Sequence, residues 1–487
     1  MKKLHEKIIP AYPPEKYPIK ILQVGEGIFL RGFFDWMIQE SAEQGNFSGS
    51  IAVTNPRCSG REKLELLKSH KGMYTVLMKG IKNGEIYENN KIITVFSKFI
   101  DPYSEWENFL ALAHLPELEF VISNTTEAGI QYKPLPFTEN MPLESFPSKL
   151  AALLYKRFNY YQGDSSKGLI MLPCELIDQN GDRLKEIVLQ HCEDWKLPKA
   201  FILWVKNQNL FLNSLVDRIV SGFPENNALE IFSSVGYEDA LLTVAEPYHL
   251  WAIQGDKALD NRLPLQKSGL NVSWVNDLTP YQIRKVRILN GTHILMTHLG
   301  MLMGFEEVEE AISDQKFGQF IQSGMAEIID SLELASDESW EYARGVVERF
   351  KNPFLHHKLA SISLNGTSKF KVRVLPSLEV YTAKNNKTPA KIVRSLAALI
   401  RFYKTEKLAD EYIGKGFYGN TFTVQDNEQT LAFFNEQWRL LEKEEISFYN
   451  FVQNVLGNKN VWETDLNKIP DLTNEVLHSL SEMEEVK

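Results

Sequence analysis

The sequence predicts an α/β domain with a mostly parallel sheet, followed by a second domain that is mainly α-helical. Over about the first 220 residues, short apolar runs alternate with helical patterns, the order of elements that builds a parallel sheet. From Thr279 onward, long stretches keep helical periodicity and alternating β-branched runs are scarce. We therefore expect the first domain to cover residues 1–278 and the second to cover residues 279–487.

Four short apolar runs in the first half are bounded by turn residues and are predicted to be buried strands. They are Ile19–Val24, Ser50–Thr54, Glu119–Ser123 and Gly168–Leu172. Such runs lack the polar alternation of a half-exposed strand, which is typical of strands with helices on both faces. The acidic end of the chain is expected to be solvated and frayed.

Composition and charge exclude several classes of protein. The 487 residues carry a net charge of −10, which argues against nucleic acid as a partner. Cys58, Cys174 and Cys192 are far apart and form no CxxC motif, so we expect neither a disulfide framework nor a structural zinc site. No apolar run is long enough to cross a membrane, and the N-terminus lacks the apolar run of a signal peptide. We expect a cytoplasmic protein without a membrane partner.

A glycine turn directly follows the first predicted strand. Gly25-Glu26-Gly27 stands before a helical pattern, the context of a dinucleotide-binding fingerprint of a Rossmann-like domain, in which the helix start holds the pyrophosphate. The third glycine of that fingerprint would stand at position 30, where the chain has Leu30. A plain tight turn is an equal alternative. Arg31 is predicted either to reach a phosphate or to be a solvated helix residue.

The second predicted strand ends without the acidic residue that commonly holds the adenosine ribose of NAD. Asn55 and Arg57 occupy that region. By charge alone Arg57 slightly favours NADP, because an arginine accommodates the 2′-phosphate. A surface arginine in a loop explains the sequence equally well.

Three polar residues in the stretch KVRILNGTH form a candidate catalytic group. On an α-helix, Lys285, Asn290 and His293 point at about 0°, 140° and 80°, within one broad face. A lysine can act as general acid/base, an amide can stabilise a developing alkoxide, and an imidazole can hold a substrate hydroxyl. The alternative is an amphipathic helix with a solvated lysine and a core histidine.

Signals for other chemistries are weak. His356 and His357 are adjacent, and His293 and His298 are five residues apart, so neither pair has the spacing of zinc ligands. The chain contains no GxSxG and no GxxxxGK[ST] motif, which leaves a serine hydrolase or a P-loop enzyme without support.

Several motifs in order resemble the mannitol dehydrogenase family, the polyol-specific long-chain dehydrogenases, over nearly the whole chain. The family signature K-x4-N-x2-H matches at Lys285, Asn290 and His293. Further matching segments are VGEGIFLRGF, SNTTEAG, PCELIDQNGD, LVDRI, RFKNP and LNGTSKF. Within the family, the glycine turn and PCELIDQNGD are most similar to the branch that interconverts tagaturonate and altronate.

The resemblance implies a zinc-independent, NAD-dependent oxidoreductase with a hexuronate or hexonate substrate, and a monomer. Lys285 would be the general acid/base, Asn290 would stabilise the alkoxide, and His293 would contact substrate. The implied cofactor-binding residues are Ile21, Leu22, Gln23, Val24, Gly25, Glu26, Gly27, Ile28, Phe29, Leu30, Arg31, Gly32, Thr126, Glu127 and Asp217, and the substrate-binding residues are Lys369, Arg373 and His357.

Two positions depart from the polyol-oxidising members. A second oxyanion-hole asparagine would align with Leu176, and a substrate-binding arginine would align with Ser361. Asn290 would then act alone, or Glu175, Asp178 or Asn180 would reshape the site. A uronate carboxylate needs cationic partners, for which the candidates are His357, Lys358, Lys369 and Arg373. Fructuronate reductase and mannitol 2-dehydrogenase are the alternatives within the family, and a binding protein without turnover is the alternative outside it.

Overall fold

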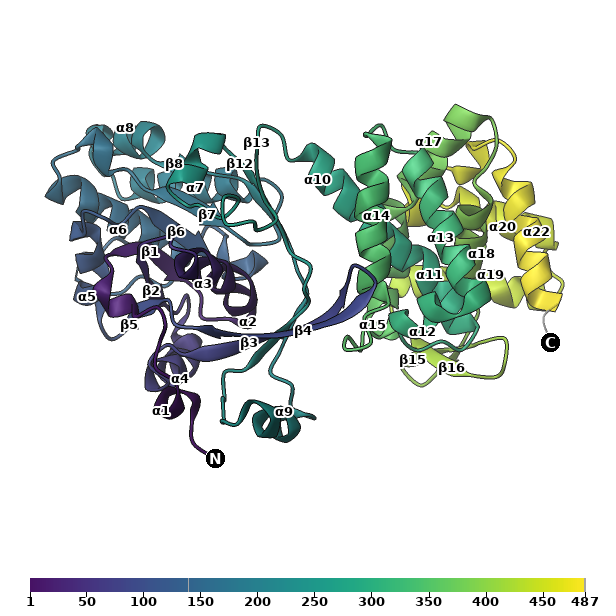
Figure 1. Cartoon of the computed structure of the whole chain (residues 1–487). Coiled ribbons are helices and arrows are strands. Elements are labelled where there is room, and N and C mark those ends of the chain that lie inside the picture. Colours follow the sequence, from purple (N-terminus) through teal and green to yellow (C-terminus); the bar gives the residue numbers. More distant parts are fainter. Residues whose placement is uncertain (139, 486–487) are drawn as a thin grey trace. The chain divides into compact units, whose positions relative to one another are not determined.

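The computed structural model describes residues 1–138 and 140–485 (Figure 1). The chain divides into two compact units. The first unit holds Met1–Lys79 and Ile86–Leu278, and the second holds Gly80–Glu85 and Thr279–Lys487. The tip of a long hairpin, which the sequence groups with the first half, thus belongs to the second unit.

A six-stranded parallel sheet forms the centre of the first unit. In spatial order its strands are β5 (Phe96–Ile100), β2 (Ser50–Thr54), β1 (Ile19–Val24), β6 (Phe120–Ser123), β7 (Ile170–Pro173) and β8 (Leu210–Phe211). The chain order reverses between β1 and β6, and ligands of such sheets bind outside the carboxyl ends of the strands at this point. The predicted Rossmann-like fold class is confirmed, and the four predicted strands are all in this sheet.

Helices cover both faces of the sheet. Ile21 of β1 packs into the apolar cluster on one face, and its neighbour Leu22 packs into the cluster on the other. This explains the continuous apolar runs, since both faces are buried. The helices of the first unit are α1 (Leu4–Lys7), α2 (Ile28–Leu30), α3 (Trp36–Glu43), α4 (Arg61–Ser69), α5 (Trp106–Ala111), α6 (Phe146–Tyr160), α7 (Asn180–Asp194), α8 (Lys199–Gln208) and α9 (Ala228–Val235).

Two smaller sheets complete the first unit, and the sequence analysis did not find them. One joins β10 (Val220–Gly222), β11 (Thr243–Ala245), β3 (Tyr74–Lys82) and β4 (Glu85–Ile93); the other joins β13 (Val272–Val275), β12 (Leu250–Gln254) and β9 (Ser214–Asp217). β9, β10 and β11 are short and β4 is mostly polar and exposed, so these four lack the apolar run that signals a strand. β3 and β12 do carry such runs, YTVLM and LWAI, which were not singled out from the sequence.

The second unit is mainly helical around one large apolar cluster. Its helices are α10 (Thr279–Ile283), α11 (Gly291–Leu302), α12 (Val308–Ser313), α13 (Gln315–Asp330), α14 (Ser336–Phe350), α15 (Leu359–Ser363), α16 (Gly366–Arg373), α17 (Leu375–Asn385), α18 (Ala390–Phe402), α19 (Glu428–Glu442), α20 (Phe448–Gly457), α21 (Lys459–Trp462) and α22 (Leu472–Glu485). It also holds an antiparallel sheet of β14 (Thr405–Leu408), β15 (Glu411–Lys415) and β16 (Thr421–Val424).

The acidic end of the chain is helical, so the expectation of a frayed end is wrong as far as Glu485. Leu480 and Met483 of α22 are buried, and Glu484 pairs with Lys404 at 2.7 Å. Apolar burial and ion pairs together hold this last turn. Among the described residues, no helix is long and apolar enough to span a membrane. In the same part of the chain no three His, Cys, Asp or Glu side chains gather as metal ligands would.

Candidate active site and cofactor-binding site

The turn after β1 requires glycine at position 25. Gly25 has a φ of +129°, which side chains with a Cβ rarely adopt. An added Cβ would also lie 3.0 Å from the carbonyl oxygen of Asn124. The N–H of Gly25 donates to the carbonyl oxygen of Thr54 at 2.9 Å. The first glycine of the turn therefore fits between the ends of neighbouring strands.

The second glycine has no such steric reason within the protein. Gly27 has an ordinary φ of −70°, and an added Cβ would meet no described atom within 4 Å. The helix begins at Ile28, and the first N–H groups of a helix have no partner within it. Open space beside these donors fits the pyrophosphate of a dinucleotide.

Gly32, two residues beyond the expected third glycine, lets the helix pack closely. An added Cβ at Gly32 would lie 2.8 Å from Val220 of β10. Leu30, at the expected position, is instead a core residue. The close helix packing of the usual fingerprint is thus provided two residues later in this chain.

A buried polar network supports the glycine turn from below. Gln23 donates to the carbonyl oxygen of Gly25 at 3.0 Å, and the Tyr74 hydroxyl donates to Asp35 at 2.8 Å. Burial raises the pKa of Asp35 to about 7. Arg31 is 8% exposed, with its guanidinium 5.6 Å from the centre of the Tyr74 ring. The alternative of a solvated Arg31 is therefore wrong, while its contact with a phosphate stays a prediction.

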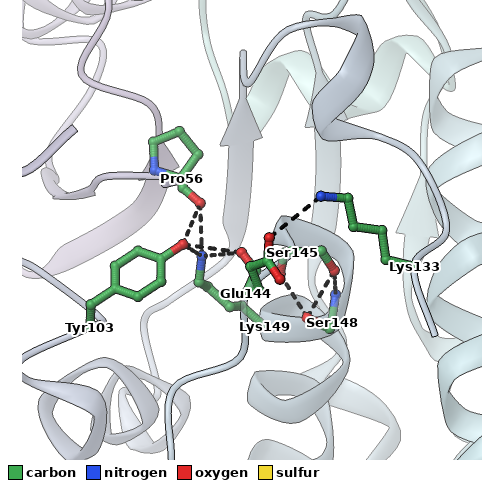
Figure 2. A network of polar contacts seen from close by, with 7 residues as sticks. All are labelled: Pro56, Tyr103, Lys133, Glu144, Ser145, Ser148 and Lys149. Carbon is green, nitrogen blue, oxygen red and sulfur yellow. Dashed lines mark hydrogen bonds and ion pairs between the residues drawn. The ribbon is translucent and has the colours of Figure 1, made fainter. Parts of the chain in front are cut away.

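Lys149 fixes the loop that follows β2 (Figure 2). Its ammonium donates to the carbonyl oxygens of Pro56 and Glu144 at 2.8 and 3.1 Å and to the Tyr103 hydroxyl at 2.8 Å. Burial lowers the pKa of Lys149 to about 7. Burial of Lys149 is not predictable from the sequence, because a lone lysine in a helical pattern carries no signal of burial.

Glu175 fixes the backbone at the end of β6. One of its carboxylate oxygens accepts from the N–H and the hydroxyl of Thr125, both at 2.9 Å, and the other accepts from Ser123 at 3.0 Å. The next residue, Thr126, has a φ of +87° and a ψ of 162°, a strained conformation that persists only where the surroundings enforce it. Gly129 closes the turn, since an added Cβ would lie 2.1 Å from the Thr125 hydroxyl.

The segment after β7 contains Asn180, one of the residues expected to reshape the site where the family asparagine is replaced by Leu176. The amide of Asn180 donates to the carbonyl oxygens of Pro173, Glu175 and Ser214 at 3.0–3.1 Å. Asn180 is thus fully occupied in holding the loop, and its role in reshaping the site is excluded. Leu176 is 66% exposed.

Most of the predicted cofactor-binding residues are buried. Between Ile21 and Gly32, only Gly27, Ile28 and Phe29 are not. The buried apolar members therefore offer backbone groups to a ligand rather than side chains.

Two predicted residues lie farther along the chain. The side chain of Glu127 lies outside the described part of the structure. Asp217 ends β9, and the next residue, Arg218, donates to the carbonyl oxygen of Gly32 at 2.7 Å. This contact brings the predicted residue near the helix that follows the glycine turn.

In the second unit, the predicted catalytic residues lie on a π-helical turn over Arg284–Asn290 that continues as α11. A π-turn closes its hydrogen bonds across five residues, so Asn290 lies nearly above Lys285. The 140° separation expected from α-helical geometry is therefore wrong. His293 follows three residues later, and Lys285 and Asn290 are both half-buried. Turns of this kind are frequent at functional sites.

Two arginines anchor the π-turn to neighbouring helices. Arg284 pairs with Glu338 of α14 at 2.5 Å, and Arg287 donates to the Ser377 hydroxyl of α17 at 2.5 Å. These contacts hold the turn from two sides, which supports a fixed orientation of the residues it carries.

His293 is a buried, neutral imidazole. Its ring centre lies 4.4 Å from that of Phe350 and 5.0 Å from that of His357. Burial, followed by the charges of His357, Arg349 and Arg373, lowers the pKa of His293 well below 6.5. A neutral imidazole can exchange hydrogen bonds with a substrate hydroxyl.

Cationic side chains gather around this histidine. Gly291 lets α16 approach, since an added Cβ would lie 3.0 Å from the carbonyl oxygen of Arg373. Lys369 donates to the carbonyl oxygen of Ile362 at 2.8 Å, and burial and Arg373 lower its pKa. We call the cations Arg349, Lys369 and Arg373, together with the neutral imidazoles of His293 and His357, the cationic cluster. Arg349, 7% exposed, was not singled out from the sequence, although it lies in the matching segment RFKNP.

Lys358, the remaining candidate for the carboxylate, pairs with Glu307 at 2.7 Å and with Glu306 at 3.4 Å. These ion pairs balance part of its charge within the protein, and its contact with the substrate stays a prediction. Ser361, which aligns with the family arginine, is exposed and donates to the carbonyl oxygen of Lys358 at 2.7 Å.

Comparisons with known proteins agree over the whole chain. Residues 19–267 match the mannitol dehydrogenase Rossmann domain, and residues 277–484 match the mannitol dehydrogenase C-terminal domain. The chain belongs to the mannitol dehydrogenase family. It is 41% identical over 487 residues to an altronate oxidoreductase of Bacillus subtilis (strain 168), and the match covers 100% of this chain and 96% of the relative. An altronate oxidoreductase of Halalkalibacterium halodurans is 37% identical over 470 residues, covering 96% and 91%.

Solved structures share the fold of this mannitol dehydrogenase family member. A D-sorbitol dehydrogenase in substrate-free form has a TM-score of 0.78 at 18% identity, covering 100% of this chain and 98% of the other. Mannitol 2-dehydrogenase of Pseudomonas fluorescens, in a ternary complex with NAD and D-mannitol, has a TM-score of 0.66 at 19% identity, covering 98% and 94%. The family predicted from the sequence is therefore confirmed.

Proposed function

We propose that this protein is an NAD-dependent oxidoreductase that interconverts D-tagaturonate and D-altronate in hexuronate breakdown. The full-length relatives named altronate oxidoreductase support the substrate. The observation that carries the proposal is the cationic cluster beside the π-turn of Lys285 and Asn290, because a sugar acid brings a carboxylate to the reacting carbonyl.

A nicotinamide cofactor would supply the hydride to the carbonyl carbon, or accept it in the reverse direction. Lys285 gives a proton to the carbonyl oxygen as its negative charge grows, and takes it back in the oxidation. Asn290 donates a hydrogen bond to the same oxygen. Both groups project from one turn, so a single oxygen can receive the proton and the hydrogen bond together.

The cationic cluster would hold the rest of the substrate. Lys369 and Arg373 pair with the carboxylate, since charge-assisted hydrogen bonds are about twice as strong as neutral ones. His293 and His357, whose pKa values are lowered by burial, offer neutral imidazoles to hydroxyl groups. This division explains why Ser361 replaces the arginine of polyol-oxidising members.

The cofactor would lie on the predicted first domain, residues 1–278, and the substrate on the predicted second domain, residues 279–487. The helix start at Gly27 and Ile28 would hold the pyrophosphate. Thr126, held in its strained conformation by Glu175 and Thr125, would present its backbone toward the nicotinamide end.

Initial rates of NADH and NADPH oxidation test the proposal with D-tagaturonate, D-fructuronate and D-fructose as substrates. We expect the highest kcat/KM with NADH and tagaturonate, and the lowest with fructose, which lacks the carboxylate. Faster turnover of fructuronate would favour the related reductase. Faster oxidation of mannitol than of altronate would contradict the sugar-acid substrate, and NADH binding without oxidation by any hexuronate would favour the binding protein.

A further inference from the structure

The end of β2 lacks an acidic residue, yet a carboxylate lies beside it. This inference rests on the proposed NAD dependence and concerns the adenosine end of that cofactor. Strand β2 ends in Thr54 and is followed by Asn55, Pro56 and Arg57. In dinucleotide-binding domains, the acid that holds the adenosine ribose usually stands here.

Glu26, between the two glycines of the turn, fills this place from the neighbouring strand. An added Cβ at Gly60 would lie 2.7 Å from Oε1 of Glu26 and 2.9 Å from the Cβ of Asn55. The Glu26 carboxylate therefore lies between the turn after β1 and the loop after β2. These two segments flank the adenosine ribose in domains of this fold.

The loop that faces Glu26 is held in place. Lys149 and Tyr103 bind the carbonyl oxygen of Pro56 (Figure 2). Arg57 donates to the carbonyl oxygen of Thr125 at 3.4 Å, so its guanidinium is engaged with the end of β6. Burial raises the pKa of Glu26, and the charges of Lys63, Arg31 and Arg57 oppose this shift, so the positive charge of Arg57 acts on the Glu26 carboxylate.

The carboxylate also has unused hydrogen-bonding capacity. Glu26 is 9% exposed, and Oε2 has no hydrogen-bond partner among the residues that the structure describes. A buried acceptor without a partner is unfavourable. A hydroxyl group is the neutral donor that would satisfy it without bringing a second negative charge.

We propose that Glu26 accepts a hydrogen bond from the adenosine ribose of NAD and thereby selects NAD over NADP. The ribose hydroxyls donate to the carboxylate, whereas the 2′-phosphate of NADP would place a second anion against it. Glu26 is then a specificity-determining residue supplied by the glycine turn instead of by β2.

Direct titration of NADH, NADPH and ADP-ribose against the wild type and Glu26→Gln tests this inference. ADP-ribose reports the adenosine end without any turnover. We expect Glu26→Gln to raise the Kd of NADH and ADP-ribose about tenfold and to lower that of NADPH. An unchanged ratio of NADH to NADPH affinity would overturn the inference.

Glu62→Gln is the matched control, because Glu62 is an exposed glutamate in the first turn of α4. It should leave the cofactor preference unchanged, and an equal shift in this variant would also overturn the role of Glu26. If Glu26→Gln unfolds, Glu26→Asp decides: it should weaken NADH binding and still reject NADPH, whereas equal weakening of both would contradict the inference. If the wild type binds NADH and Glu26→Gln keeps the wild-type cofactor preference, the role of Glu26 is contradicted and the proposed function stands. If the wild type binds neither NADH nor NADPH, the role of Glu26 and the proposed function are both contradicted.

Discussion

Lys285 and Asn290 share one face because of a π-helical turn, and the residues around them set the chemistry that they can perform. Arg284 and Arg287 fix the turn from α14 and α17. His293 is kept neutral by burial and by the cations near it. At the scale of single residues, the candidate site therefore combines a lysine, a carboxamide and a neutral imidazole, to which the proposed function assigns proton transfer, oxyanion binding and hydroxyl binding.

Replacing Lys285 with alanine should abolish nearly all turnover. Loss of a general acid/base costs about 10²- to 10⁴-fold in rate, so we expect kcat for tagaturonate reduction to fall by about 10³-fold. NADH affinity should change by less than about twofold, because the predicted nucleotide-binding residues are in the other unit. Steady-state kinetics and NADH titration measure both quantities. Lys316→Ala, at an exposed lysine of α13, is the control, and near-normal turnover of Lys285→Ala would refute the assigned role.

His298 gives a pH dependence that can be measured separately. It is fully buried, and burial lowers its pKa from 6.5 to about 3. As pH falls below 6.5 the unfolded chain takes up a proton that the folded chain does not, so stability is lost until about pH 3. The loss amounts to about 2 kcal/mol at pH 5.

Replacing His298 with leucine should remove this loss. We expect the stability of His298→Leu to decline less than that of the wild type between pH 7 and pH 5, by about 2 kcal/mol, in urea unfolding at each pH. The stabilities of wild type and variant are compared at each pH because Asp35 is present in both. Its raised pKa of about 7 makes the protein more stable as the pH falls, which is opposite to the effect of His298. His478→Leu, at a side chain that is 71% exposed, should keep the wild-type slope. Identical slopes in wild type and His298→Leu would refute the assignment.

At the scale of elements, the segment from β1 into α3 combines a turn that the fold requires with a position that it leaves open. Gly25 is required by its backbone conformation and by Asn124, whereas Gly27 faces open space. Substitutions at Gly25 and Gly27 should therefore separate an effect on folding from an effect on ligand binding.

Alanine at these two positions should have separate effects. Gly25→Ala should lower the free energy of unfolding by about 1–3 kcal/mol through backbone strain. Gly27→Ala should leave it within about 0.5 kcal/mol but raise the Kd of NADH at least about tenfold, since the methyl group would occupy the space for the pyrophosphate. Urea unfolding and NADH titration measure the two effects. Unchanged NADH binding in Gly27→Ala would show that the cofactor does not approach this turn.

For the whole molecule, an acidic protein carries a locally cationic site. The chain has a net charge of −10, yet Arg349 and Arg373 lie close enough to His293 to lower its pKa, and Lys369 lies beside Arg373. Long-range repulsion and local attraction then act together on an anionic substrate, and salt screens both. Because the cations of the cluster are expected to lie closest to the bound carboxylate, whereas repulsion from charges beyond a Debye length is already largely screened, the loss of attraction should dominate KM.

Raising the salt concentration should therefore raise KM for the sugar acid more than for a neutral ketose. Between about 0.02 and 0.3 M salt we expect KM for tagaturonate to rise several-fold and KM for fructose to stay nearly constant. Arg373→Ala should reduce this dependence, because one of the attracting charges is lost. If both substrates respond equally, the cationic cluster does not bind the carboxylate.

The sequence alone was sufficient for the parallel sheet, the helical second half, the glycine turn and the family. Each of these depends on local signals: apolar run length, the period of 3.6, a glycine after a strand, and motifs in fixed order. The polar strand β4 and the shortest strands of the small sheets lay beyond prediction, since such strands are stabilised by partners distant in the chain. The apolar runs of β3 and β12 were local signals that were not used.

The tertiary structure decided how the site residues are presented. Several features of the site depend on contacts between segments far apart in sequence. They are the π-turn, the burial of Arg31 and Lys149, the hydrogen bonds from Thr125 to Glu175, and the position of the Glu26 carboxylate beside the loop after β2. Lysine, arginine and glutamate look the same in a sequence whether solvated or buried, and only the packing around them determines their charge state and partners. The sequence thus determined which chemical groups this protein carries, and the fold decided which of them can act together.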